Sequence, residues 1–103
     1  MKILLIGGSG FLGAWVARVI QKYMFQTRIM DLVKPNLEWH RLSGIQHPEW
    51  IQGDISKKSD VENALKDCDG VVNLAGLLTP QCSAQPLRGA EVNLLGTIHV
   101  FEA

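Results

Sequence analysis

The sequence lacks the patterns that mark metal sites, nucleic-acid binding and membrane insertion. Its two cysteines, Cys68 and Cys82, form no Cys-x-x-Cys pair, and no histidines stand at metal-binding spacing, which favours two reduced thiols over a disulfide. Ten basic and ten acidic residues give no net charge, and no block of like charge occurs, so we expect neither nucleic acid nor an acidic membrane as a partner. No apolar run approaches the roughly 20 residues of a membrane span, and the run after Lys2 is too short for a signal peptide. These absences predict a cytoplasmic protein.

The chain has the size and the apolar content of one folded segment. Its 103 residues are 47% apolar, enough for a packed core, and they contain no repeat and no low-complexity linker, so residues 1–103 are interpreted as one unit. Short apolar runs bounded by turn residues predict strands, and helical periodicity predicts helices. The expected strands cover residues 3–6, 27–30, 50–53 and 70–74, and the expected helices cover residues 12–23, 35–42, 59–65 and 88–103.

The alternation of strands and helices predicts an α/β fold. Successive strands that are separated by helices pair in parallel, with helices on both faces of the sheet. Right-handed crossovers then give the strand order 3-2-1-4, which is half of a doubly wound, Rossmann-type sheet.

Three helix signals give more local predictions. In the first helix, large apolar residues recur at helical spacing and predict the buried face. Pro35 is expected to start a short second helix that stops near Gly44. Ser59 and Glu62 have the spacing of a capping box at the start of the third helix. The apolar stripe of the first helix consists of Leu12, Trp15, Val16, Val19, Ile20 and Tyr23.

A glycine-rich turn lies between the first strand and the first helix. Gly8, Gly10 and Gly13 match the G-x-G-x-x-G fingerprint, and Gly7, Gly10 and Gly13 match the looser G-x-x-G-x-x-G spacing. Glycine allows the tight bend and the close approach of phosphates, while the helix N-terminus supplies free N–H groups and partial positive charge. Because the motif follows a strand and precedes a helix that leads to a second strand, it predicts binding of a dinucleotide pyrophosphate. The alternative is a glycine-rich turn of another α/β fold.

Asp31 follows the second strand, 18 residues after Gly13. A carboxylate at this place accepts hydrogen bonds from the hydroxyls of the adenosine ribose and repels a 2′-phosphate, so the sequence favours NAD over NADP. Arg28 and Lys34 are close enough in sequence to keep NADP open. The alternative role for Asp31 is that of a solvated acid at the end of a strand.

These motifs resemble the N-terminal part of the extended short-chain dehydrogenases/reductases, and most closely the NAD-dependent epimerase/dehydratase family. The resemblance depends on the opening segment, on the acid Asp31, and on three motifs: Gly-Asp-Ile, Val-Asn-Leu-Ala-Gly and Val-Asn-Leu-Leu-Gly-Thr. These segments occupy residues 2–13, 31, 53–55, 72–76 and 92–97.

The resemblance implies roles for individual residues. Asp54 and the N–H of Ile55 would read the adenine edge, small residues after the fourth strand would line the adenosine side of the cofactor, and Asn93 would hold the backbone near the active site. The alternatives are that Asp54 caps a turn and that Asn93 is an exposed helix residue. The cofactor-binding residues expected in this way are Gly7, Gly10, Phe11, Leu12, Gly13, Asp31, Asp54, Ile55, Leu74, Ala75, Gly76 and Asn93.

The catalytic residues of the resembled family are missing. They include a Tyr and a Lys four residues later, whose charge lowers the tyrosine pKa for proton transfer. The one tyrosine here is Tyr23, and Thr27 stands four residues later. We therefore expect the NAD-binding N-terminal part of an enzyme that transfers hydride on a nucleotide-sugar or similar carbonyl or alcohol substrate, with no activity in this chain alone. The alternative is a non-catalytic module that senses NAD(P) or binds another protein.

Self-association is a further expectation. The fourth strand, residues 71–74, would leave an open parallel edge with unpaired N–H and C=O groups. The last helix is apolar on several sides, and in the resembled family equivalent helices build dimer interfaces. The sequence thus predicts a homo-oligomer that forms through one of these two elements.

Overall fold

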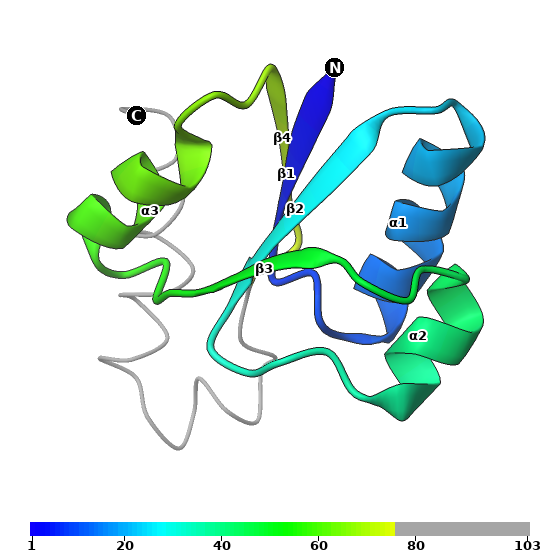
Figure 1. The fold of residues 1–103 in the computed structure, drawn as a ribbon. Coiled ribbons are helices and arrows are strands. Elements are labelled where there is room, and N and C mark those ends of the chain that lie inside the picture. The colour runs from blue at the N-terminus through cyan, green and yellow to red at the C-terminus, as the bar shows by residue number, and fades with distance from the viewer. Residues whose placement is uncertain (76–103) are drawn as a thin grey trace.

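The computed structural model describes residues 1–75, which form a four-stranded parallel sheet with helices on both faces (Figure 1). The strand order β3-β2-β1-β4 confirms the predicted Rossmann-type topology. The helix expected at residues 88–103 lies outside the described residues. In chain order the elements are β1 (Lys2–Ile6), α1 (Phe11–Lys22), β2 (Gln26–Asp31), α2 (Leu37–Ser43), β3 (Glu49–Gln52), α3 (Lys58–Leu65) and β4 (Gly70–Asn73).

The parallel register brings the carboxyl ends of the strands to one edge of the sheet. Ile6 of β1 pairs with Met30 of β2 and with Asn73 of β4, and Asp31 of β2 pairs with Gln52 of β3. The segments that follow the four strands are therefore collected at this edge, which we call the carboxyl edge. The opposite edge, at the starts of the strands, is called the amino edge.

The core has two halves, one on each face of the sheet. Successive side chains of a strand point to opposite faces, so Leu4 and Ile6 of β1 pack toward α3 while Leu5 packs toward α1 and α2. Both faces of β1 are buried, as its continuous apolar run predicts. The buried cluster on the α3 side contains Leu4, Ile6, Met30, Ile55, Val61 and Ala64, and the cluster on the α1 and α2 side contains Leu5, Ala14, Ala17, Ile29 and Trp39.

α1 buries only some of the large apolar residues of the predicted stripe, so that prediction is wrong in part. The buried residues of α1 are Gly13, Ala14 and Ala17. An ideal Cβ on Gly13 would lie 2.1 Å from the carbonyl oxygen of Gly8, so the helix lies so close to the glycine turn that small side chains fill the contact. Of the predicted stripe, Val16 and Ile20 pack against the core, whereas Leu12, Trp15, Val19 and Tyr23 are exposed.

α2 begins slightly later than predicted and ends where predicted. The side chain of Asn36 accepts a hydrogen bond from the N–H of Trp39 at 2.9 Å, so Asn36, and not Pro35, defines the start of the helix. Gly44 ends it in the left-handed conformation, with φ of 76°, which favours glycine.

The capping box predicted for α3 does not form. The helix starts at Lys58, so Ser59 lies inside its first turn, and no side chain caps it at Lys57. The carboxylate of Asp60 instead accepts a hydrogen bond from the N–H of Asp54 at 2.9 Å. The first turn of α3 is therefore tied to the end of β3 and not to its own N-cap.

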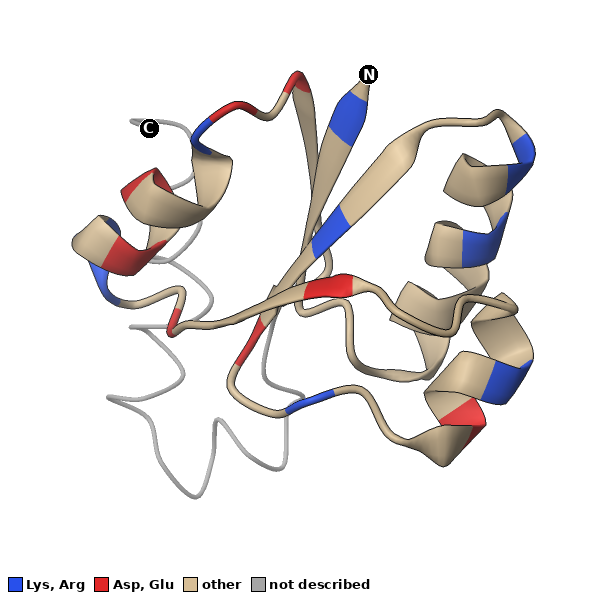
Figure 2. Ribbon diagram, viewed as in Figure 1, with Lys and Arg blue, Asp and Glu red and all other residues tan. Residues whose placement is uncertain are grey.

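Charged residues of both signs are dispersed over the described sheet and helices (Figure 2). No helix within residues 1–75 is long and apolar enough to cross a membrane.

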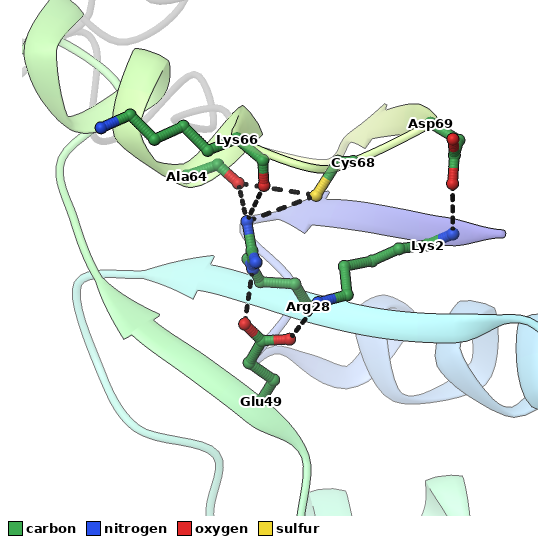
Figure 3. Close-up of polar contacts among 7 residues, drawn as sticks. All are labelled: Lys2, Arg28, Glu49, Ala64, Lys66, Cys68 and Asp69. Carbon is green, nitrogen blue, oxygen red and sulfur yellow. Dashed lines mark hydrogen bonds and ion pairs between the residues drawn. The ribbon is translucent and has the colours of Figure 1, made fainter.

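Arg28 is buried at the amino edge, where it joins β2 to β3 and α3 (Figure 3). Its Nε donates to Oε1 of Glu49 at 2.8 Å. Its Nη1 donates to the carbonyl oxygens of Ala64 and Lys66 at 2.7 and 2.6 Å, and these are carbonyls that the end of a helix leaves unpaired. Nζ of Lys2 lies 3.0 Å from Oε2 of Glu49, so one carboxylate binds two cations. We call these five residues the amino-edge network.

Cys68 packs beside the amino-edge network. Its Sγ lies 3.5 Å from Nη1 of Arg28 (Figure 3), and the residue is half-buried. Burial raises the pKa of the Cys68 thiol above its ordinary value, against the smaller effect of the nearby Arg28 charge. Cys68 is therefore a packed thiol and not an activated thiolate.

We predict that Glu49→Gln lowers the free energy of unfolding at pH 7 by about 0.5 to 1 kcal/mol, because solvent screens a carboxylate that is 43% exposed. Partial burial alone would raise the pKa of Glu49, but hydrogen bonds from Lys2 and Arg28, with their charges, outweigh it and hold that pKa below its ordinary value of 4.5. A carboxyl with a lowered folded-state pKa stabilises the fold above its unfolded-state pKa, and this stabilisation is lost as the pH falls through the folded-state value. Urea denaturation should therefore show the parent and the variant converging between about pH 5 and pH 3.

Glu38→Gln is the matched control for this prediction. Glu38 forms an ion pair with Arg41 on the exposed surface of α2, and its pKa is also lowered, chiefly by the hydrogen bond from Arg41. This variant should change the stability less than Glu49→Gln, because neither partner is buried. An equal loss in the two variants, or a Glu49→Gln loss that does not diminish with acidification, would show that the amino-edge network contributes nothing specific.

Candidate functional site

A cavity of about 360 Å³ opens at the carboxyl edge of the sheet. Its lining residues come from the ends of β1 and β2 and from the segments that follow all four strands, which is where ligands bind in open parallel sheets. Its volume is in the range of cofactor and small-molecule sites. Of the residues that the sequence suggests for a cofactor, the lining includes Gly7, Gly10, Asp31, Asp54, Ile55, Leu74 and Ala75.

The glycine turn forms one wall of the cavity, and three of its glycines, Gly7, Gly8 and Gly13, make contacts that leave no room for a Cβ. Gly7 has φ of 74°, and an ideal Cβ on it would lie 2.8 Å from the backbone nitrogen of Ala75. Gly13 allows α1 to lie against the Gly8 carbonyl, as described above. The turn is thereby packed between the end of β4 and the start of α1.

Gly10 differs from its neighbours because it faces open space. It is the N-cap of α1, and an ideal Cβ on it would meet no atom of the described residues within 4 Å. The first turn of α1 contains no acidic residue. Gly10 therefore presents a helix N-terminus, with its unpaired N–H groups and partial positive charge, to the cavity. Such an arrangement favours an anion, above all a phosphate.

Asp31 lines the cavity beside the glycine turn, and two backbone N–H groups orient its carboxylate. Oδ2 accepts a hydrogen bond from the N–H of Ser9 at 3.1 Å, and Oδ1 accepts one from the N–H of Leu32 at 2.7 Å. The hydroxyl of Ser9 also donates to the carbonyl oxygen of Val33 at 2.8 Å, so the glycine turn is joined twice to the segment after β2. An ionised carboxylate has about four acceptor positions. Asp31 therefore retains acceptor capacity for hydroxyl groups in the cavity.

Asp54 lines the cavity and also shapes the turn in which it lies. Its Oδ1 accepts hydrogen bonds from the N–H and the hydroxyl of Ser56, at 2.9 and 2.7 Å. The turn-capping alternative for this residue is thus realised. The side chain of Ile55 is buried in the core under α3.

The end of β4 closes the wall beside the glycine turn. The N–H of Leu74 donates to the carbonyl oxygen of Ile6 at 2.8 Å, which prolongs the pairing of β4 with β1. The side chain of Asn73 accepts a hydrogen bond from the N–H of Ala75 at 3.0 Å and so ends the strand. Gly76 and Asn93 lie outside the described residues.

Three of the expected site residues do not line the cavity. Phe11 and Leu12 are exposed on α1, and Gly13 lies behind the turn, where it packs on Gly8. The tyrosine Tyr23 ends α1 at the opposite end from Gly10 and is 67% exposed. Among residues 1–75, no three His, Cys, Asp or Glu side chains group to hold a metal ion.

Two residues that support the site were not among those expected from the sequence. Ser9 occupies a variable position of the glycine motif, yet its N–H and hydroxyl join the turn to Asp31 and Val33. Trp39 of α2 donates from Nε1 to the carbonyl oxygen of Gly8 at 2.6 Å. A hydroxyl side chain between two glycines, as at Ser9, could have indicated its role. No spacing rule connects Trp39 to Gly8, which lies 31 positions earlier.

Several relatives match this chain over nearly its whole length. It is 32% identical over 111 residues to a CDP-paratose 2-epimerase of Salmonella typhi, a match that covers 100% of this chain and 32% of the relative. It is 33% identical to human 3 beta-hydroxysteroid dehydrogenase type 7, with 97% of this chain and 28% of the relative covered. The chain spans about a third of the length of such relatives.

Solved structures share the fold at lower identity. A UDP-glucose-4-epimerase from Stenotrophomonas maltophila, crystallised with bound NAD and formylated UDP-arabinopyranose, superposes with a TM-score of 0.82 at 22% identity, over 99% of this chain and 32% of that one. The UDP-glucose 4-epimerase of Thermus thermophilus in complex with NAD gives 0.79 at 24% identity, over 99% and 33%.

A family match over nearly all of the sequence identifies the family of this chain. Residues 4–103 match the 3-beta hydroxysteroid dehydrogenase/isomerase family, and the epimerases and dehydrogenases among the relatives agree with it. The sequence-based resemblance to the extended short-chain dehydrogenases/reductases is thereby confirmed. The chain belongs to the 3-beta hydroxysteroid dehydrogenase/isomerase family, within the extended short-chain dehydrogenases/reductases.

Proposed function

We propose that this chain binds NAD in the carboxyl-edge cavity, as the cofactor-binding N-terminal part of an NAD-dependent epimerase or dehydrogenase. The observation that supports the proposal best is the pairing, across one cavity, of an uncapped helix N-terminus at Gly10 with the oriented carboxylate of Asp31. A dinucleotide has the two groups that these features suit, a pyrophosphate and a ribose diol.

The residues of the cavity fit the cofactor. The open space at Gly10, which a Cβ would begin to fill, suits the pyrophosphate. Asp31 would accept hydrogen bonds from the adenosine ribose, and Asp54 with Ile55 would border the adenine. Leu74 and Ala75 supply a small apolar wall on the same side.

NAD is proposed over NADP because Arg28 and Lys34, the two cations three residues from Asp31 in sequence, do not line the cavity. Arg28 is bound at the amino edge by Glu49 and the end of α3, where it cannot meet a 2′-phosphate. Lys34 is exposed and stands outside the cavity lining, and the Asp31 carboxylate would repel the extra phosphate. NAD-bound relatives of the same fold agree with this choice.

The reaction of the whole protein would be hydride transfer to or from a carbonyl or alcohol, with a nucleotide sugar as the substrate class that the epimerase relatives suggest. The bound nicotinamide would supply the hydride chemistry. The sequence has no Tyr-x-x-x-Lys, so this chain provides no proton-transfer pair of its own. The second candidate is a cytoplasmic module that senses NAD(P) or binds a partner without catalysis.

We predict that NAD binds the 103-residue chain and that Gly10→Ala weakens the binding at least about tenfold, a change of about 1.4 kcal/mol. The added methyl group would occupy the space proposed for the pyrophosphate, while the free protein has no described atom within 4 Å to clash with it. Isothermal titration calorimetry with NAD, NADP and ADP-ribose is the measurement, with NAD and ADP-ribose expected to bind more tightly than NADP.

Gly70→Ala is the matched control, because it adds the same methyl group at the amino edge, 3.1 Å from the flexible end of Ile3. It should leave the NAD affinity unchanged. The absence of heat with all three ligands would refute the proposed function, and equal weakening by the two alanine variants would refute the placement of the pyrophosphate.

We also predict that the 103-residue chain shows no NAD-dependent turnover. Nucleotide-sugar epimerase and alcohol dehydrogenase assays, followed by absorbance at the NADH band and by product analysis, should stay at the level of buffer with NAD. Turnover above that level, abolished by Gly10→Ala, would show that the missing Tyr-x-x-x-Lys is replaced by other residues of this chain.

We further propose that the chain self-associates through the edge of β4 or through the segment predicted as the last helix. Within residues 1–75, β4 pairs with β1 alone, and Val71 is 39% exposed. An unpaired strand edge is a template for another chain. The last segment lies outside the described residues and enters this proposal from its apolar sequence.

Light scattering at micromolar concentration should therefore give a mass above that of one chain. Val71→Lys should lower the assembled fraction if β4 forms the contact, because a charged side chain on an edge strand opposes pairing. Leu37→Lys, which changes an 87% exposed apolar residue of α2, is the control and should have no effect. A parent protein that remains monomeric would refute self-association.

A further inference from the structure

The peptide group between Gly8 and Ser9 is held at both ends by side chains from other elements. Its carbonyl oxygen accepts a hydrogen bond from Nε1 of Trp39 at 2.6 Å, and its N–H donates to Oδ2 of Asp31 at 3.1 Å. Because a peptide group is planar and trans, its C=O and N–H point in opposite directions. A side chain that fixes the carbonyl therefore also fixes the direction of the N–H.

Trp39 is itself held in place on all sides. The residue is 2% exposed and packs in the cluster with Leu5 and Ala14. Its backbone N–H donates to Asn36, which starts α2, and its ring lies edge-to-face against His40 with centroids 5.5 Å apart. The indole N–H thus reaches the Gly8 carbonyl from a rigid support (α2 and α1 lie side by side in Figure 1).

The N–H at the other end of the Gly8–Ser9 peptide group binds the Asp31 carboxylate. Leu32 fixes one carboxylate oxygen from the same chain segment, whereas the N–H of Ser9 fixes the other from the glycine turn. Without the Ser9 contact, the carboxylate would be held by one donor and could rotate about its own Cβ–Cγ bond. The orientation of both oxygens therefore depends on the direction of the Gly8–Ser9 peptide.

We propose that Trp39 is a positioning residue for the ribose site: through the Gly8–Ser9 peptide it sets the orientation of the Asp31 carboxylate, and with it the preference for a free ribose diol over a ribose 2′-phosphate. The inference rests on the proposed function, because it concerns NAD and NADP in the same cavity. It adds a residue of α2 that contacts neither the proposed cofactor nor the cavity.

Trp50 provides the comparison that separates positioning from packing. It is a half-buried tryptophan that packs against the same cluster as Trp39, but its Nε1 has no hydrogen-bond partner among residues 1–75. Trp50→Phe removes an indole from this half of the core without touching the glycine turn. Trp39→Phe removes an indole together with the bond to Gly8.

The test compares the two variants for their affinities to NAD and NADP by calorimetry. Trp39→Phe should weaken NAD about fivefold, the typical effect of one hydrogen bond, and weaken NADP less, so that the NAD/NADP ratio falls. Trp50→Phe should leave the ratio unchanged. In the Asp31→Asn background, Trp39→Phe should no longer alter the ratio, because two residues that act through one another are not additive. A ratio that is unchanged in Trp39→Phe, while NAD still binds, would overturn the inference and leave the proposed function intact.

A second measurement needs neither NAD nor a tryptophan variant. In NMR spectra of the free protein, Asp31→Asn should shift the indole N–H resonance of Trp39 and the amide resonance of Ser9, but not the indole resonance of Trp50. If the Trp39 resonance does not move, the peptide does not couple the two side chains. That result would overturn the inference even if NAD did not bind.

Discussion

The contact between Gly13 and the carbonyl group of Gly8 determines where α1 lies, and the rest of the site depends on it. With no Cβ between them, the helix approaches the turn closely enough for its N-terminus to open on the cavity at Gly10. The same approach leaves room for small residues alone at the helix–sheet contact, which is why Ala14 and Ala17 are buried. A side chain at position 13 would displace the helix, the turn and the helix N-terminus at the cavity together.

Different contacts hold the separate parts of the site rigid. The glycine turn is fixed by Ala75 on one side and by α1 on the other. Asp31 is oriented by backbone N–H groups, and Asp54 is engaged in the turn that it caps. Little of this arrangement has to form when a ligand enters, and preorganised groups lose less conformational entropy on binding.

The sequence was sufficient for the topology because its strongest signals are local. The apolar run of β1, the glycine turn and the alternation of elements each follow from neighbouring residues, and together they allow one strand order. The buried face of α1 was not predictable from periodicity, because a stripe of large residues such as Leu12 and Val19 outweighs two alanines on any hydropathy scale. The size limit comes from Gly8, a tertiary neighbour. Ser59 failed as a cap for a similar reason, since the adjacent Asp60 joins the helix to Asp54.

The amino-edge network and the cavity lie at opposite ends of the same strands. At the amino edge, the carboxylate of Glu49 binds the cations of Lys2 and Arg28, and Arg28 also binds the end of α3. At the carboxyl edge, the charge of the Asp31 carboxylate and the dipole of α1 face the cavity. Sequence drift can therefore act on the two edges separately. Substitutions near Asp31 can change which ligand the cavity binds, while the amino-edge network continues to stabilise the fold. A family with such a sheet can therefore diversify its chemistry without changes in its core.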